Sequence, residues 1–226
     1  MAETELVVRM VGPKEAATTV VLLHGFGAGG DDLVPLGREI GVAGVRYLFP
    51  AAPLALDPHG DSRAWWMIDV ERLMTRPAER LIDEQPDGLP PARALISGLL
   101  DRLEADGAGR IVLGGFSQGA MLSLDVALHR ERPLAGLALM SGTHINASAW
   151  KPRLARLRGV PIFMSHGTRD PLLPFVISRG LRDQLAAAGA ELDWVEFPGG
   201  HEIPRPVLAG LTRLVSRIAS APPAAP

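Results

Sequence analysis

Short apolar runs, most of them bounded by glycine or proline, recur along the chain and constrain its fold more than any other feature. The runs are continuous rather than alternating, the pattern of strands whose two faces are both covered by helices. Strands are predicted at residues 19–25, 46–51, 110–116, 136–142 and 160–167, with a further one at 191–197. These runs favour a mostly parallel sheet.

Segments with helical periodicity lie between the predicted strands. In residues 91–107, leucines recur at the spacing of a helical turn, and Gly107 ends the segment. Two more helices are predicted at 175–189 and 207–220. Strands that alternate with helices in this way predict the α/β class, with a doubly wound sheet and helices on both faces.

The length of 226 residues suits one hydrophobic core of this class, so a single domain is predicted over residues 1–219. Residues 220–226 are rich in Pro and Ala and are expected to form a flexible tail. Residues 53–91 are rich in Pro, Asp, Arg and Trp, which indicates an excursion from the sheet or a lid-like insertion. The acidic N-terminal segment does not match a secretory signal, which favours the cytoplasm, and no apolar run is long enough for an integral membrane segment.

The charge balance narrows the classes of partner. A formal net charge of −2 leaves no excess of cations to neutralise a nucleic acid backbone, so no nucleic acid partner is expected. The absence of cysteine excludes thiolate nucleophiles and cysteine-ligated metals. This composition is compatible with a small-molecule substrate, and the sequence leaves the oligomeric state open.

The pentapeptide GFSQG at residues 115–119 carries the strongest chemical signal. It follows the predicted strand 110–116 and precedes a helix-like segment, which is the context of a strained turn that exposes a nucleophilic Ser117. Gly115 and Gly119 flank the serine and would let strand and helix pass closely. The alternative is a glycine-rich turn in which Ser117 only caps the helix.

A serine nucleophile needs a base, and the base needs an orienting acceptor. In hydrolases built on such a sheet, the order along the chain is nucleophile, acid, histidine, with the last two on loops after later strands. Asp170 follows the predicted strand 160–167, and His201 lies in the loop after strand 191–197. Asp193 is a weaker candidate for the acid. A turn aspartate and a solvated loop histidine are the alternative interpretations.

A strand that ends in HGFG and leads into a glycine-rich turn indicates a loop whose backbone can bind an oxyanion. The two predicted donors are the N–H groups of Phe26, in this loop, and of Gln118, the residue after the nucleophile. His24 is expected to fix the shape of the loop by a hydrogen bond. The glycine spacing of residues 25–30 also matches a dinucleotide phosphate loop, but no suitably placed acidic residue follows.

Four segments in this order resemble the phospholipase/carboxylesterase family, which includes bacterial carboxylesterases and acyl-protein thioesterases. The segments are LLHGFG, GFSQGA, HGTRDPLLP and PGGHEIP, and the likeness spans about residues 20–215. The resemblance implies an α/β-hydrolase fold, a catalytic triad of Ser117, Asp170 and His201, and an oxyanion hole at Phe26 and Gln118. It implies no cofactor and no metal.

The resemblance leaves the substrate open. Residues 57–91 depart from the family pattern in length and polarity, while Trp65 and Trp66, in AWWMI, are predicted to line a hydrophobic acyl site or else to cover the core. Hydrolysis of carboxylic esters through an acyl-enzyme on Ser117 is the expected activity. Thioesterase or lysophospholipase activity, acyl transfer and noncatalytic ligand binding are the alternatives. Dienelactone hydrolases share the fold but use a cysteine nucleophile, which this chain lacks.

Overall fold

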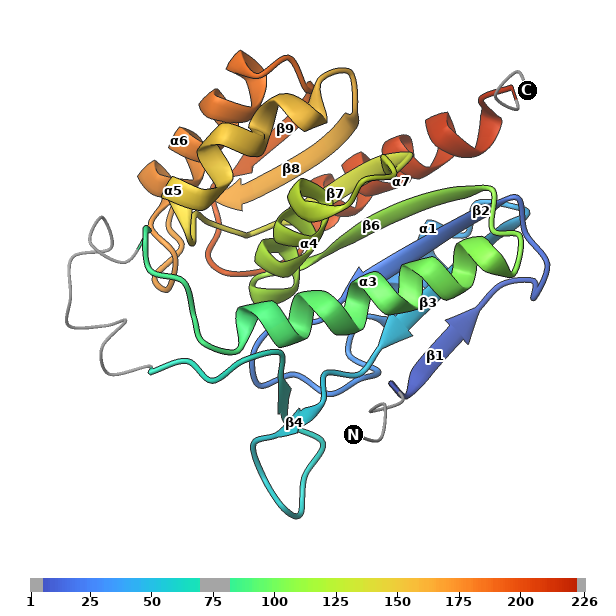
Figure 1. The fold of residues 1–226 in the computed structure, drawn as a ribbon, viewed down its shortest axis with the longest axis horizontal. Coiled ribbons are helices and arrows are strands. Elements are labelled where there is room, and N and C mark those ends of the chain that lie inside the picture. Colours follow the sequence, from blue (N-terminus) through green and yellow to red (C-terminus); the bar gives the residue numbers. More distant parts are fainter. Residues whose placement is uncertain (1–5, 70–81, 223–226) are drawn as a thin grey trace.

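The computed structural model describes residues 6–69 and 82–222. In this part of the chain a seven-stranded sheet with the order β1-β3-β2-β6-β7-β8-β9 forms the centre (Figure 1). Strand β1 is antiparallel to β3, and the other neighbours are parallel. The strands are β1 (Val8–Val11), β2 (Thr18–Leu23), β3 (Val45–Pro50), β6 (Arg110–Phe116), β7 (Gly136–Met140), β8 (Pro161–Gly167) and β9 (Glu191–Phe197).

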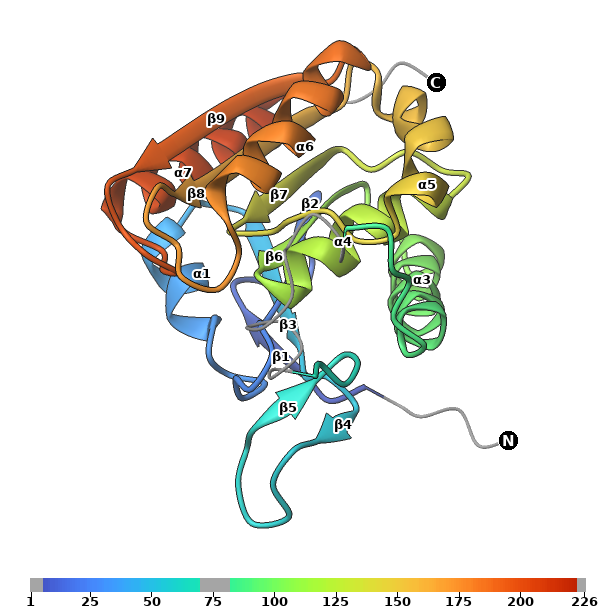
Figure 2. The same ribbon diagram turned by 90° about the vertical axis from the view of Figure 1, so that its left-hand side faces the viewer.

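Helices cover both faces of the sheet (Figure 2). One face packs against α1 (Val34–Ile40) and α7 (Arg205–Ser220). The other face packs against a larger group of helices. These are α3 (Leu89–Ala105), α4 (Gln118–His129), α5 (Ala147–Trp150), the 3-10 helix η2 (Lys151–Leu157) and α6 (Phe175–Ala187).

The two cores explain why the apolar runs are continuous. In β2, Val20 and Leu22 face the core under α1 and α7, whereas Val21 and Leu23 face the core under α3 and α4. Successive side chains of a strand point to opposite faces, so a strand with helices on both sides is apolar at every position. The predicted α/β architecture with helices on both faces is confirmed, and each of the six predicted strands is present.

Strand β1 and a short hairpin within residues 53–91 were not predicted. Strand β1 lies at the edge of the sheet with only partly buried side chains, so it lacks the continuous apolar run that marks the inner strands. The hairpin pairs β4 (Leu54–Ala55) with β5 (Arg63–Ala64) and projects from the sheet (Figure 2). Each of its strands has two residues, too few for a pattern to be visible in the sequence.

Helix α3 begins at Leu89, two residues before the predicted start, so the end of the 53–91 segment belongs to this helix. Two prolines occupy its first turn, where a missing N–H and a fixed φ are tolerated. Three predictions concern residues that the structure does not describe. Residues 70–81 belong to the predicted lid-like insertion, residues 223–226 make up most of the predicted tail, and residues 1–5 belong to the segment that was compared with a secretory signal.

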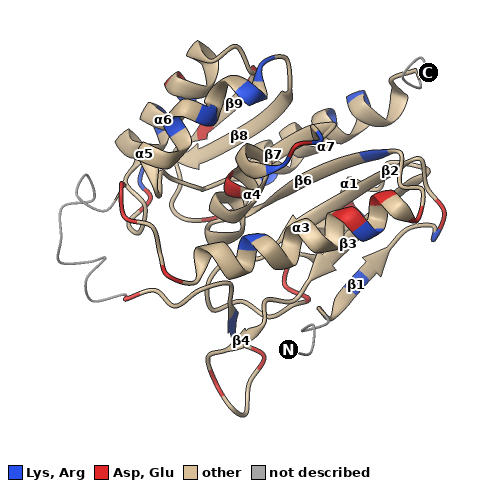
Figure 3. Cartoon of the chain, in the orientation of Figure 1, with Lys and Arg blue, Asp and Glu red and all other residues tan. Residues whose placement is uncertain are grey.

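Charged residues of both signs are interspersed over the helices and loops that the structure describes (Figure 3). Among the same residues, the helices are all too short or too polar to cross a membrane. Because β2, β6, β7, β8 and β9 are parallel, the loops after them meet at one edge of the sheet. This edge collects residues 24–33, 117, 141–146, 168–174 and 198–204, which are the loops that carry the predicted site.

Candidate active site

Ser117 occupies a sharp turn between β6 and α4. Its backbone has φ 55° and ψ −116°, a conformation that L-residues rarely adopt. The Ser117 N–H donates to the carbonyl of Met140 at 2.9 Å, which ties the turn to the end of β7. Strained backbone of this kind persists only where its surroundings hold it, and it gathers at functional sites. The turn therefore has the geometry that the GFSQG motif predicts.

Two glycines let the end of β2 pass against this turn. A Cβ atom on either Gly115 or Gly119 would clash with the carbonyl oxygen of Leu23. The close approach brings the next loop to the serine, since a Cβ on Gly25 would lie 3.3 Å from the Cβ of Ser117. The glycines of the motif therefore serve to place the HGFG loop beside Ser117, as well as to form the turn.

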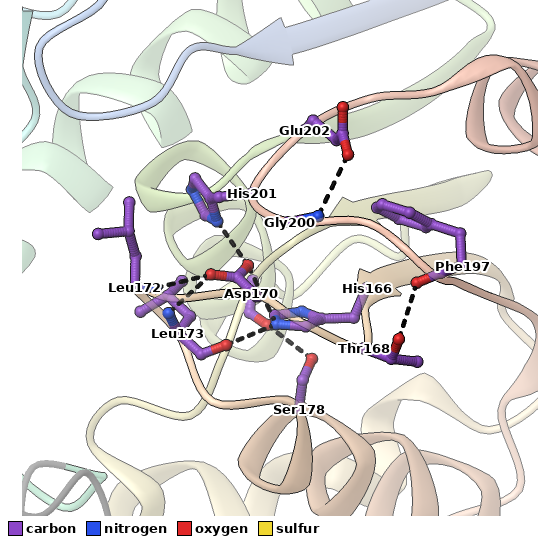
Figure 4. Close-up of polar contacts among 11 residues, drawn as sticks. His166, Thr168, Asp170, Leu172, Leu173, Ser178, Phe197, Gly200, His201 and Glu202 are labelled. Atoms are coloured by element: carbon purple, nitrogen blue, oxygen red, sulfur yellow. Dashed lines mark hydrogen bonds and ion pairs between the residues drawn. The ribbon is translucent and has the colours of Figure 1, made fainter.

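Asp170 lies in the turn after β8, and its side chain is completely buried. Its Oδ1 accepts the N–H groups of Leu172 and Leu173, each at 2.9 Å, and its Oδ2 accepts Nδ1 of His201 at 2.7 Å (Figure 4). Burial favours the neutral acid, but the hydrogen bond to His201 and those to the two backbone N–H groups outweigh it and lower the pKa of Asp170. The carboxylate is therefore ionised at neutral pH, and the stability it contributes is lost only as the pH falls through that lowered pKa.

His201 lies in the loop after β9 and connects the aspartate to the serine turn. A carboxylate can only accept, so Nδ1 of His201 carries the proton and Nε2 of the neutral ring is left as an acceptor. The imidazole packs against the ring of Phe116, the residue before Ser117, with 4.7 Å between ring centroids. The structure thus brings Asp170 and His201 into contact and places the histidine beside the serine turn.

The loop that carries His201 depends on close contact with the end of β8. A Cβ on Gly167 would clash with the backbone carbonyls of Gly199 and Gly200. We expect Gly167→Ala to displace this loop and to lower kcat about 100-fold, because displacement of a catalytic group by about 1 Å costs that much. Gly180→Ala is the matched control, since a Cβ there meets nothing within 4 Å. Equal kcat in the two variants would show that the contact does not position His201.

Comparison with known proteins decides the family. A sequence model of the phospholipase/carboxylesterase family matches residues 5–216. The chain belongs to this family. It is 32% identical over 175 residues to acyl-protein thioesterase 1 of Cryptococcus neoformans var. neoformans serotype D, covering 73% of this chain and 71% of that protein. The protein of the same name from Schizosaccharomyces pombe is 30% identical over 177 residues, covering 75% of this chain and 76% of its relative.

Solved structures agree with the sequence comparison. The crystal structure of esterase PE8 has a TM-score of 0.82 to this chain at 26% identity, and covers 95% of this chain and 100% of its own. This phospholipase/carboxylesterase family member therefore has the α/β-hydrolase fold. It is an enzyme of the serine hydrolase class.

In this family member, hydrogen bonds at His24 and at Gly27 fix the shape of the HGFG loop. The His24 ring accepts the N–H of Ala52 at Nε2 (3.0 Å) and donates from Nδ1 to the carbonyl of Gly25 (2.8 Å). Burial lowers the pKa of His24 and keeps the ring neutral, as this pair of bonds requires. The Gly27 N–H donates to the carbonyl of Arg63 at 2.9 Å, which fixes the other side. The expected hydrogen-bonding role of His24 is confirmed.

Gln118 links the two predicted oxyanion loops through its buried side chain, a role that the sequence did not indicate. Its Oε1 accepts the N–H of Trp65 at 2.9 Å, and its Nε2 donates to the carbonyl of Trp66 at 2.8 Å. The Trp65 indole N–H in turn donates to the carbonyl of His24 at 3.0 Å. Because Gln118 is the first residue of α4, its own N–H has no acceptor within the helix.

The two tryptophans lie in the core beneath these loops. Trp65 is 2% exposed and Trp66 is 3% exposed, whereas the neighbouring Met67 is 65% exposed. The Trp65 indole contacts the loop that carries Phe26, and backbone groups of both tryptophans bind the side chain of Gln118. Most of their contacts therefore fit the alternative interpretation, in which the tryptophans cover the core. Contact of either tryptophan with a substrate stays a prediction.

The structure also separates Asp170 from its weaker rival. Asp193 lies on β9, is about half exposed, and pairs with Arg213 of α7 at 3.0 Å. Two of the three glycines that matched a phosphate loop have packing roles instead. Gly25 lies against Ser117, and a Cβ on Gly30 would clash with Ala51.

Proposed function

We propose that this protein is a carboxylesterase that hydrolyses acyl esters through an acyl-enzyme on Ser117. One observation carries the proposal: the hydrogen-bonded pair of Asp170 and His201 lies beside a serine held in strained backbone at the start of a helix. That arrangement supplies a nucleophile, a base with a free acceptor nitrogen and a fixed anion behind the base. The helix N-terminus adds a positive potential where negative charge develops.

Acylation begins when Nε2 of His201 takes the hydroxyl proton of Ser117. The serine oxygen bonds to the substrate carbonyl carbon, and the electron pair of the C=O bond moves to its oxygen. The N–H groups of Phe26 and Gln118 are proposed to bind this oxyanion, and Asp170 stabilises the imidazolium. When the carbonyl re-forms, the ester C–O bond breaks and the leaving alkoxide takes the proton from Nε2.

Deacylation repeats these steps with water as the nucleophile. His201 takes a proton from the water, whose oxygen bonds to the acyl carbon. Collapse of the second tetrahedral intermediate breaks the bond to Ser117, and the serine oxygen recovers its proton from Nε2. The products are an alcohol and a carboxylic acid. Each step uses only side chains and backbone groups of this chain together with water.

Thioester hydrolysis is the second candidate, and lysophospholipids are a third, in line with the phospholipases that the family description names. The specific support for thioesters is that the relatives at 32% and 30% identity are named acyl-protein thioesterase 1. The same acyl-enzyme would serve, with a thiolate as the leaving group. Acyl transfer to an alcohol differs only in the acceptor, and product analysis with a competing alcohol separates it from hydrolysis.

A matched series of substrates tests the proposal. Acylcholines and the corresponding acylthiocholines differ only in the atom that leaves, and a set with increasing acyl length reports on the acyl site. We expect the oxygen esters to be hydrolysed with higher kcat/KM, corrected for uncatalysed rates, at every chain length. A consistent preference for the thioesters would favour the second candidate, and no turnover of either set would contradict both.

The same series tests the proposed acyl contact of the tryptophans. Trp66→Phe keeps the backbone carbonyl that Gln118 binds, while it removes part of the indole. If Trp66 contacts the acyl chain, the preferred chain length shifts because the pocket gains volume. An unchanged preference in the folded variant would leave Trp66 with its supporting role alone. Trp65→Phe serves as the comparison, since it removes the indole bond to His24 as well.

A further inference from the structure

His166 is a second histidine on the carboxylate of Asp170. Its Nε2 lies 3.3 Å from Oδ2 of Asp170, the same oxygen that His201 binds at 2.7 Å (Figure 4). The His166 side chain is completely buried, one residue before the end of β8. The serine mechanism described above makes no use of this group.

The contacts of His166 define which of its atoms carries a proton. Nε2 is 2.8 Å from the carbonyl oxygen of Leu173, and a carbonyl can only accept. Nε2–H is therefore a donor to the Leu173 carbonyl, and the Asp170 carboxylate lies beside it as an electrostatic contact at 3.3 Å. Burial lowers the pKa of His166 and outweighs the opposing effects of the Leu173 and Gly142 carbonyls and of the Asp170 charge, so the ring is neutral at neutral pH.

The Asp170 carboxylate and the Leu173 carbonyl lie at the two ends of the turn formed by residues 170–173. Within that turn, Oδ1 of Asp170 accepts the N–H groups of Leu172 and Leu173, but these donors belong to the turn itself. Leu172 is 43% exposed, so the outer side of the turn faces solvent. His166 instead belongs to an inner strand of the sheet, paired with both β7 and β9. It connects the turn to the interior of the central sheet.

We propose that His166 is a positioning residue that fixes the Asp170 carboxylate toward His201, because its Nε2–H donates to the Leu173 carbonyl while Nε2 lies in electrostatic contact with Oδ2 of Asp170 at 3.3 Å. The proposal rests on the proposed function, because it acts through the triad. Loss of this donor frees the turn to rotate, and the carboxylate then holds the imidazole less accurately in the transition state. Since the interaction is felt after substrate is bound, kcat falls and KM is retained.

Two substitutions separate positioning from packing. His166→Leu keeps an apolar side chain in the space but removes the donor, and we expect kcat to fall about 10-fold to 100-fold with unchanged KM. His166→Gln places an amide N–H near the position of Nε2 and should restore most of kcat. His129→Leu is the control, since that ring also contacts a backbone carbonyl, at 2.7 Å, but has no contact with Asp170.

A double-mutant cycle with Asp170→Asn tests the route of action. If His166 acts through Asp170, adding His166→Leu to Asp170→Asn causes little further loss of kcat, because the carboxylate it positions is already gone. Multiplicative losses in the cycle, or a Gln variant as slow as the Leu variant at equal thermal stability, would overturn the positioning role while Ser117→Ala stays inactive. An active Ser117→Ala would instead overturn the proposed function itself.

Discussion

Replacement of Ser117 by alanine is expected to lower kcat for ester hydrolysis by about 10⁴-fold or more. The reason is that no acyl-enzyme can form without the serine oxygen, and only binding and the oxyanion donors remain to accelerate attack by water. Steady-state hydrolysis of a p-nitrophenyl ester measures the loss. The fold should survive, because the backbone bond from residue 117 to Met140 does not involve the side chain.

A glycine at the same position separates catalysis from folding. Ser117 has φ 55°, a conformation that costs an L-residue about 1–3 kcal/mol but costs glycine little. Ser117→Gly should therefore be as inactive as Ser117→Ala and at least as resistant to thermal unfolding. An alanine variant that keeps substantial turnover while folded would contradict the assignment of the nucleophile.

Substitution of Asp170 by asparagine has the second largest expected effect, a loss of about 10⁴-fold in kcat. The amide cannot stabilise the imidazolium, and its N–H₂ group favours the wrong tautomer of His201, with Nδ1 unprotonated. The buried position makes the change severe, because the side chain is completely enclosed and no water can replace the lost acceptor. Measurement of kcat and KM across neutral pH gives the result.

Asp193→Asn is the matched control for this change. Its carboxylate forms a largely exposed ion pair with Arg213, so its loss should cost no more than about 1 kcal/mol of stability and leave kcat unaltered. Equal losses in the two variants would mean that the effect of Asp170→Asn reflects general charge removal. A near-normal kcat for Asp170→Asn would remove Asp170 from the triad.

Much of the architecture could be predicted because its physical cause is local. Each inner strand is covered by helices on both faces, so Val20 to Leu23 read as one apolar run that stands out in the sequence. Strand β1 was not predicted because it lies at the edge of the sheet, where Met10 is half exposed and no continuous apolar run is needed. The 3-10 helix η2 escaped because its few buried residues, such as Leu154 and Leu157, give too short a pattern.

The three proposed catalytic residues could be predicted because of their order along the chain and their positions after strands. The motif around Ser117 and the turns that hold Asp170 and His201 each follow a recognisable strand. Contacts between residues far apart in the sequence leave no pattern of this kind. Gln118 reaches Trp65 and Trp66 more than 50 positions earlier in the chain, and His166 is hidden inside a run that already reads as a buried strand.

The two tryptophans show how composition alone can mislead about a role. Adjacent aromatic residues in a polar stretch are expected either at a binding surface or over a core, and only the contacts distinguish these cases. Trp65 donates to the His24 carbonyl, and both Trp65 and Trp66 accept or donate backbone bonds with Gln118. These bonds make the pair part of the scaffold of the site, whichever substrate it binds.

Covalent labelling with a fluorophosphonate tests the central claim most directly. Trypsin releases residues 111–130 as one peptide, which contains Ser117 and one other hydroxyl, that of Ser123. The account predicts one label per chain, located by fragmentation on Ser117, absent from Ser117→Ala and much slower in His201→Ala. A label on Ser123 or on another peptide, or no label on the active protein, would contradict it.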